Sequence, residues 1–305
     1  GARSVRTIAL SFSLVRSSAG GAGFDHEHYW RRSLLSAVAA KALANRLGTQ
    51  WWEEAFLGAL LQDIGMLALS AALGAEYGAL VAQSLGDHVA LAQSEQSALG
   101  ADHAQVGSWL VERWRLPSVL GAAVRTSHAP CCDPDDRESV EGLHGAIVAA
   151  SGWLADIWLH EDTAAATALA RVRAHDLLGM DGGAIELVLE DIAEATPELA
   201  GLFEMVILPP EALINILDQA REALAQLSMQ HLRSAVNAEA TTRTLEARND
   251  QLRAESELDP LTSLGNRRRL EAALESEFAA AAYLGQPLSV LFCDIDHFKR
   301  VNDTF

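Results

Sequence analysis

Cysteine is scarce in this sequence, and its scarcity bears on the compartment in which the protein works. Among 305 residues there are three cysteines, Cys131, Cys132 and Cys293. The adjacent pair is poorly placed to form a bridge, and an odd count does not indicate a disulfide framework. We therefore exclude a small disulfide-stapled secreted domain and expect a reducing cytosol, that is, a cytoplasmic protein.

Basic residues and long apolar runs are also in short supply. Lysine and arginine number 23 against 41 aspartate and glutamate residues, which gives a formal net charge of -18. A chain this acidic does not bind nucleic acid phosphates through its overall field. No apolar run reaches the roughly 18 residues of a membrane helix, so we expect no membrane segment.

What the sequence does contain is globular in composition, with 50% hydrophobic and 21% charged residues. Its length leaves room for roughly two domains. The chain starts at Gly1 without a methionine and stops at Phe305, shortly after a strand-like run. We interpret it as a fragment of a longer protein.

Residues 25–159 have the pattern of an all-α domain. Residues 53–69 place apolar side chains at the spacing of one helix face, and Gly48 follows another such stripe where a helix commonly ends. We assign residues 1–159 to a helical domain. Residues 160–210, which show weaker helical patterns, form a helical extension.

Proline and glycine are absent from residues 211–258, which predicts one uninterrupted helix of roughly 70 Å. Several leucines recur at intervals near seven, as in a parallel coiled coil, with polar interruptions. We predict a signalling and dimerisation helix that supports a parallel homodimer, with Leu217 and Leu224 on its seam. The alternative is an amphipathic helix that packs on its own domain.

The last part of the chain, residues 259–305, has a mixed pattern. Residues 266–282 predict a helix, and residues 288–293 form an apolar run typical of a strand buried on both faces. Asp294 and Asp296 follow that strand with the same parity, and a metal–nucleotide site needs such hard oxygen ligands. Lys299 could meet a phosphate, and Asn302 offers the donor and acceptor that a purine edge requires. A solvated loop of charges is the alternative.

Two segments strengthen the nucleotide interpretation. Residues 258–268 (LDPLTSLGNRR) and 292–305 (FCDIDHFKRVNDTF) resemble the opening signature and the first strand and turn of GGDEF domains. The resemblance implies the start of an α+β domain of the cyclase-like, ferredoxin-related kind. It further implies an enzyme that condenses two GTP molecules into cyclic di-GMP and pyrophosphate.

The same resemblance implies roles for individual residues. Asp294 matches a catalytic, metal-binding aspartate for Mg²⁺ or Mn²⁺, assisted by the carbonyl of Ile295. Substrate contacts fall on the backbone amides of His297 and Phe298, on Lys299 for phosphate and on Asn302 for guanine. The family's GGDEF loop is expected beyond Phe305, so we expect the fragment itself to be inactive as a diguanylate cyclase.

The helical domain carries a second, degenerate pattern. Residues 29–34 (YWRRSL) and 62–66 (QDIGM) resemble ligand segments of the HD superfamily of metal phosphohydrolases. At the expected ligand positions stand Arg32, Gln62, Asp63, His103, His128 and Ser151. Because three of these six are not ligands, the pattern resembles HDOD domains, the non-catalytic relatives, over about residues 1–155. This implies a regulatory domain that contacts partner proteins and holds no metal cofactor.

Together these patterns predict a signal-transduction protein. In the intact parent, an HDOD domain would control the synthesis of cyclic di-GMP from GTP. One alternative is a catalytically degenerate scaffold or nucleotide-binding protein, if the downstream half is damaged. A more remote alternative is a metal phosphohydrolase that works through the helical domain, which the missing ligands disfavour.

Overall fold

A computed structural model describes residues 23–84, 86–128, 139–203 and 205–304. Cys131 and Cys132 lie outside these residues, as does the predicted start of the helical domain. The chain divides into two compact units, Gly1–His231 and Leu232–Phe305, and each is described by itself.

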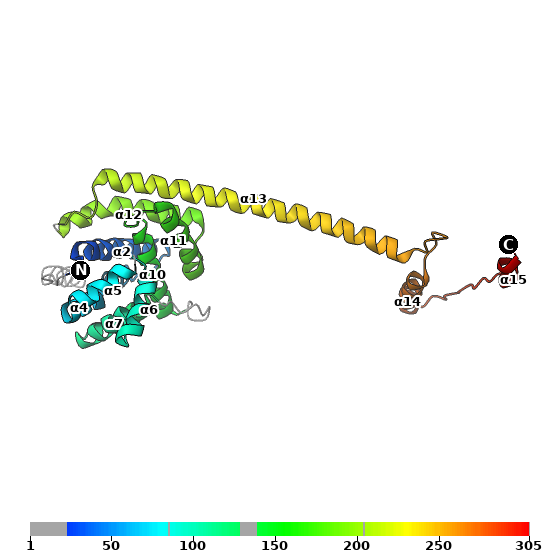
Figure 1. The fold of residues 1–305 in the computed structure, drawn as a ribbon, viewed down its shortest axis with the longest axis horizontal. Coiled ribbons are helices and arrows are strands. Elements are labelled where there is room, and N and C mark those ends of the chain that lie inside the picture. Colours follow the sequence, from blue (N-terminus) through cyan, green and yellow to red (C-terminus); the bar gives the residue numbers. More distant parts are fainter. Residues whose placement is uncertain (1–22, 85, 129–138, 204, 305) are drawn as a thin grey trace. The chain divides into compact units, whose positions relative to one another are not determined.

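The first unit is built from helices, in agreement with the predicted all-α domain (Figure 1). Its described helices are α2 (His26–Arg46), α3 (Trp52–Leu61), α4 (Ile64–Leu73), α5 (Ala75–Gln83), α6 (His88–Leu99), α7 (His103–Arg113), α8 (Ser118–Thr126), α10 (Val140–Asp156), α11 (Thr163–Leu178), α12 (Gly182–Leu202) and the first part of α13 (Pro210–Glu257).

Local sequence explains where α2 begins and ends. Asp25 caps its start, accepting a hydrogen bond from the backbone N–H of His28 at 2.9 Å. After its last turn the chain passes through Gly48 at a φ of 70°, a left-handed conformation that glycine adopts without strain. Helix α2 packs against α3, α10 and α12, and its Leu34, Leu35 and Leu43 are fully buried in the main core.

The predicted single helix over residues 53–69 is interrupted. Helix α3 ends at Leu61 and α4 starts at Ile64, so Gln62 and Asp63 form a turn between them. Gly65 makes this arrangement possible, because a Cβ at that position would lie 1.9 Å from the carbonyl oxygen of His103. The close approach of α4 to α7 therefore brings Asp63 beside the start of α7.

One stretch, Trp52–Leu73, meets the length and hydropathy requirements of a membrane span, with a mean hydropathy of 1.7. This differs from our expectation that no run would be long enough. Within the domain 61% of that window is buried, and the turn at Gln62 and Asp63 divides it. These features are typical of core helices in a soluble protein.

Helix α13 agrees with the predicted uninterrupted helix over residues 211–258, but its two halves differ. Leu217 and Leu224 are buried in the main core of the first unit. On the same half, Arg221 forms ion pairs with Glu186 and Glu190 of α12. Over this half the alternative of a helix packed on its own domain is correct, and the assignment of Leu217 and Leu224 to a dimer seam is wrong. Residues 231–252 are exposed throughout.

In the second unit, α14 (Arg267–Leu284) confirms the predicted helix, with Asn266 as its cap and Gly285 after its end. The predicted strand over residues 288–293 is not formed, and its side chains are exposed. A strand needs a neighbour to satisfy its backbone hydrogen bonds, and no sheet exists among the described residues to provide one. The α+β fold of this part is therefore not shown.

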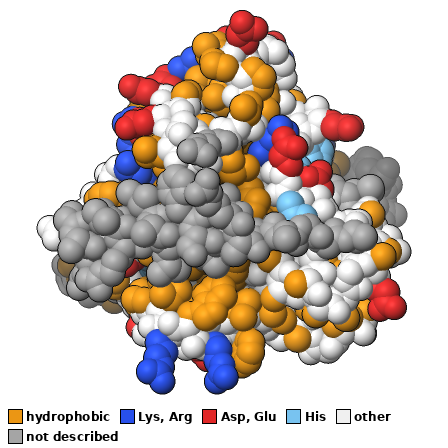
Figure 2. All heavy atoms as spheres, turned by 90° about the vertical axis from the view of Figure 1, so that its left-hand side faces the viewer, with side chains coloured by type: hydrophobic (Ala, Val, Ile, Leu, Met, Phe, Trp, Pro, Cys, Tyr) orange, Lys and Arg blue, Asp and Glu red, His pale blue; other side chains and the backbone are white. Residues whose placement is uncertain are grey.

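The surface of the molecule is mixed in character. On one face, histidine side chains lie beside acidic and basic ones, close to a broad hydrophobic area (Figure 2).

Candidate functional site

Arg32 lies at the centre of a buried charged cluster in the helical domain. Its guanidinium forms a short ion pair with one oxygen of Asp63, Oδ2. It also holds Asp156, at the end of α10, through two bonds of 2.7 and 3.2 Å. Gly152 leaves room for this side chain, since a Cβ there would lie 2.9 Å from Nη2 of Arg32. A fixed cation thus stands where the HD pattern has a ligand histidine.

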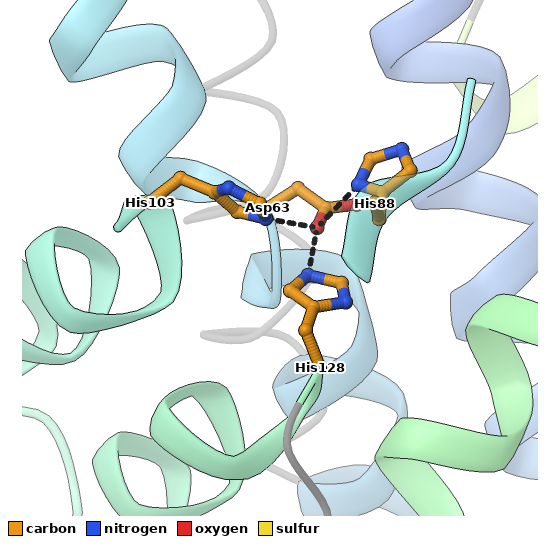
Figure 3. A group of neighbouring side chains, drawn as sticks. All are labelled: Asp63, His88, His103 and His128. Atoms are coloured by element: carbon orange, nitrogen blue, oxygen red, sulfur yellow. Dashed lines mark hydrogen bonds and ion pairs between the residues drawn. The ribbon is translucent and has the colours of Figure 1, made fainter. Parts of the chain in front are cut away.

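The second oxygen of Asp63, Oδ1, faces three imidazoles (Figure 3). His128 Nε2 lies 2.8 Å from it, at hydrogen-bonding distance. His88 Nδ1 lies at 3.4 Å and His103 Nε2 at 3.6 Å. The four ligand-type atoms all fall within 4.8 Å of one another.

Helix ends position these imidazoles. His88 is the first residue of α6 and follows its capping residue Asp87, and His103 is the first residue of α7 and follows Asp102. His128 comes just after α8. Two of the three histidines are therefore oriented by the same local device, an aspartate cap followed directly by histidine.

A chain of hydrogen bonds fixes the ring of His103 from behind. Its Nδ1 lies 2.6 Å from Oε2 of Glu95, and its backbone N–H donates to the same oxygen at 2.7 Å. The other oxygen of Glu95 accepts a hydrogen bond of 2.6 Å from the hydroxyl of Tyr77. All three side chains are buried, so His103 presents Nε2 to Asp63 in one orientation.

Burial and charge act against each other in this cluster. Burial alone would raise the pKa of Asp63, but Arg32 and the histidines hold it well below its usual value. Burial lowers the pKa of His128 to about 4. His103 is also buried, yet the carboxylates of Asp63 and Glu95 raise its pKa to about 9. Near neutral pH the carboxylates are therefore ionised, His128 is neutral and His103 carries a proton.

The remaining positions of the HD pattern have different surroundings. Gln62 is buried, and its amide atoms make no hydrogen bond within the described part of the chain. It lines a cavity together with Arg32 and His128. Ser151 does not reach the cluster, because its hydroxyl donates to the carbonyl of Val148 at 2.7 Å. Asp156, and not a residue at position 151, supplies the carboxylate that meets Arg32 at the end of α10.

His88 and Asp156 were not among the predicted site residues. A sequence signal for His88 existed, since Asp87-His88 repeats the aspartate–histidine pair of Asp102-His103 at the start of a neighbouring helix. Asp156 had no comparable signal. Only the packing of α10 on α2 shows that it meets Arg32.

In the second unit, the first GGDEF-like segment forms a compact turn between α13 and α14. Asp259 Oδ1 accepts hydrogen bonds from the backbone of Leu261 and Thr262 and from the hydroxyl of Thr262. These bonds lower the pKa of Asp259. Asn266 donates back to the last turn of α13, from its backbone to Glu257 and from its side chain to Ser256. This motif thus serves as a structural joint.

The second GGDEF-like segment is exposed. Asp294 accepts a hydrogen bond from the N–H of Ile295 at 2.9 Å, and His297 has a positive φ of 56°. Phe298, Lys299 and Asn302 lie on the short helix α15 (Phe298–Thr304). Oxygen donors such as Asp294 suit Mg²⁺. Among the described residues, however, nothing assembles around Asp294 into a group of three ligands.

Comparison with known families agrees with both resemblances. Residues 1–130 match the model of the HDOD domain. Residues 256–305 match that of the diguanylate cyclase GGDEF domain.

Curated relatives match the GGDEF part. A diguanylate cyclase of Vibrio cholerae serotype O1 is 48% identical over 56 residues, which is 18% of this chain and 17% of that protein. Diguanylate cyclase DosC of Escherichia coli K12 is 49% identical over 53 residues, 17% of this chain and 12% of that protein. The chain thus spans a small part of these relatives.

Solved structures match the helical part. A candidate phosphohydrolase from Shewanella amazonensis SB2B aligns with a TM-score of 0.53 and 21% identity, over 66% of this chain and 72% of that one. An HDOD domain protein of unknown function from Geobacter sulfurreducens aligns with a TM-score of 0.49 and 19% identity, over 65% and 67%. The first of these likenesses describes the fold alone.

Proposed function

We propose, for a chain in which an HDOD domain is followed by the start of a GGDEF domain, a regulated role in cyclic di-GMP signalling. The intact cytoplasmic protein condenses two GTP molecules into cyclic di-GMP, and the HDOD domain controls this reaction. One observation carries the proposal. Residues 256–305 match the GGDEF model, and curated diguanylate cyclases are close to half identical to this chain over 53 to 56 residues.

The residues present suit a part of that chemistry. Asp294 supplies a carboxylate, and the carbonyl of Ile295 a second oxygen, for Mg²⁺ held against the GTP phosphates. This ion neutralises charge that develops on the phosphates during transfer. The backbone of His297 and Phe298 and the amine of Lys299 bind phosphate oxygens. Asn302 pairs with the guanine edge.

Helix α13 offers a route for regulation. Its first half belongs to the core of the helical domain, through Leu217 and Leu224. Its last turn is hydrogen-bonded to Asn266, which caps the first helix of the GGDEF segment. A rotation or shift of the helix within the HDOD core would therefore reach the turn that opens the GGDEF domain. In this mechanism a parallel dimer brings two GTP half-sites together.

The test is a cyclic di-GMP assay on the full-length protein that contains this chain, with GTP and Mg²⁺. We expect product formation with GTP and little with ATP. Asn302→Ala should reduce the preference for GTP over ATP, because a site that no longer pairs with the guanine edge discriminates poorly between the two nucleotides. Asn249→Ala, a change of the same kind on the exposed part of α13, is the matched control and should preserve the preference.

A signalling scaffold without catalysis is the competing function. It predicts no cyclic di-GMP from the full-length protein at any GTP concentration, while partner binding persists. Absence of product in a folded, GTP-binding preparation would overturn the enzymatic proposal in favour of the scaffold.

A further inference from the structure

We propose that Asp63, His88, His103 and His128 bind a single divalent transition metal ion in the helical domain. The proposal concerns a site separate from the GGDEF residues and does not depend on the proposed function. It revises our expectation that this domain holds no metal, which counted three missing ligands and did not include His88.

The distances from Asp63 Oδ1 to the three imidazole nitrogens are close to those of a tetrahedral site, and the four atoms lie within 4.8 Å of one another. Metal–ligand bonds of 2.0–2.1 Å in a tetrahedral site place the donors about 3.3–3.4 Å apart. From Asp63 Oδ1, the nitrogens of His88 and His103 lie at 3.4 and 3.6 Å. His128 Nε2, at 2.8 Å, would move outward by about half an ångström as a metal bond replaces its hydrogen bond.

Two of the donor atoms make no hydrogen bond of ordinary geometry and lie at ion-pair distance from Asp63 Oδ1. His103 is completely buried, and its Nε2 makes none among the described residues. The same holds for Nδ1 of His88. A buried imidazole nitrogen without a partner costs free energy unless a proton acceptor, a water or a metal meets it. Both nitrogens point at the oxygen of Asp63 that Arg32 leaves free (Figure 3).

The hydrogen bonds that His103 makes on its other ring nitrogen resemble those of metal-bound histidines. A ligating histidine commonly donates its other N–H to a carboxylate, which fixes the ring and raises its basicity. His103 meets Glu95 in this way at 2.6 Å, and Tyr77 in turn holds Glu95.

The charge balance favours one added dication. Three carboxylates surround the cluster, those of Asp63, Glu95 and Asp156, and the cluster's guanidinium is that of Arg32. The metal-binding form has neutral imidazoles, so the proton that His103 carries near neutral pH is released; the sum is then three negative charges and one positive charge, a net of -2. A dication at Asp63 Oδ1 would bring this sum to zero.

Arg32 also limits the site to one ion. Its guanidinium occupies the space between Asp63 and Asp156, and so supplies the positive charge that a second metal would bring. Three imidazoles and one carboxylate suit zinc, iron, nickel or copper better than magnesium or calcium. A cavity of about 10 Å³, lined by His88 and His128 together with Arg32 and Gln62, adjoins the site.

The test uses the untagged chain with Zn²⁺ as the probe. After loading and desalting, elemental analysis should find one zinc per chain, and Mg²⁺ in tenfold excess should not displace it. X-ray absorption of the zinc form should show only nitrogen and oxygen neighbours near 2.0–2.1 Å. This measurement needs no variant, so it remains decisive if a variant fails to fold.

Variants then locate the ion. His88→Gln should weaken zinc binding at least about a hundredfold, since one of four ligands is lost. Glu95→Gln, behind His103, should weaken it by about 10- to 100-fold. His144→Gln changes a buried histidine outside the cluster and should leave binding unchanged. The proposal fails if no zinc is retained, if His88→Gln and His144→Gln behave alike, or if sulfur neighbours near 2.3 Å show that cysteines hold the ion.

Discussion

Two regions of this chain carry family motifs, and the fold treats them in opposite ways. In the helical domain the motif is degraded, with Arg32 and Gln62 at ligand positions, yet its residues form a tight buried cluster around Asp63. In the GGDEF segment the motif residues from 292 onward match the resemblance, yet Asp294 and Asn302 are exposed and belong to no ligand group within the described residues. The motif without replaced residues therefore belongs to the less organised site.

The difference reflects where each site finds its partners. The Asp63 cluster draws on residues of α2, α6, α7 and α10, all within one packed unit. The Asp294 segment resembles a strand-and-turn motif that would need a sheet to support it, and no sheet is present among the described residues. A motif thus identifies a family, whereas a working site requires the surrounding packing.

The largest effect on the free energy of unfolding should come from removing the buried guanidinium of Arg32. Arg32→Met leaves Asp63 and Asp156 without their main partner, and such a loss typically costs about 3–5 kcal/mol of the free energy of unfolding. Urea unfolding followed by circular dichroism measures it. Arg46→Met removes an exposed ion pair with Asp191 and should change stability little. Equal stability of the two variants would mean that the cluster does not support the fold.

The next effect concerns the first half of α13. Leu217→Ala removes a side chain that is buried in the core, and we expect a loss of about 2–3 kcal/mol in the same unfolding experiment. Leu232→Ala, an exposed leucine on the same helix, is the matched control and should cost far less. A similar small loss for both would show that this half of the helix is not part of the core.

Sequence reasoning reached the helices and the families more readily than the contacts. An apolar stripe followed by Gly48 located the end of α2, and the interval 266–282 located α14 to within two residues, because these signals are local. Asp156 was missed because its role depends on how α10 packs on α2, which no spacing encodes. The strand over residues 288–293 was predicted from its apolar run and from the resemblance to GGDEF domains, but a strand forms only with a neighbour to pair with.

A third prediction separates function from stability at the exposed site. In the full-length protein, Asp294→Asn removes a ligand charge while keeping the shape, so turnover of GTP should fall about a hundredfold. GTP binding should weaken less, because a metal acts mostly on charge that develops in the transition state. Circular dichroism should be unchanged, since Asp294 is exposed.

Asp250→Asn, on the exposed half of α13, is the control for this experiment and should retain full turnover. Near-parental turnover of Asp294→Asn would overturn the assignment of Asp294 as a metal ligand, whereas no turnover by the parental protein itself would favour the scaffold alternative.

The smallest effect should appear in self-association through the exposed half of α13. Leu217 and Leu224 are buried in the core of the helical domain, so a dimer seam has to use apolar residues that follow them along α13. Leu245 and Leu252 are seven residues apart and 64% and 49% exposed, as expected of a seam that is open in a single chain. Replacing both with glutamate should weaken dimerisation about tenfold or more without lowering stability, because charge at a seam must be desolvated on pairing.

Ala240→Glu with Ala247→Glu adds the same charge at the same spacing on another face of the helix and should leave the dimer intact. Sedimentation equilibrium distinguishes the outcomes: a parental chain that stays monomeric at all concentrations would contradict the parallel dimer and leave α13 as a helix that serves its own domain.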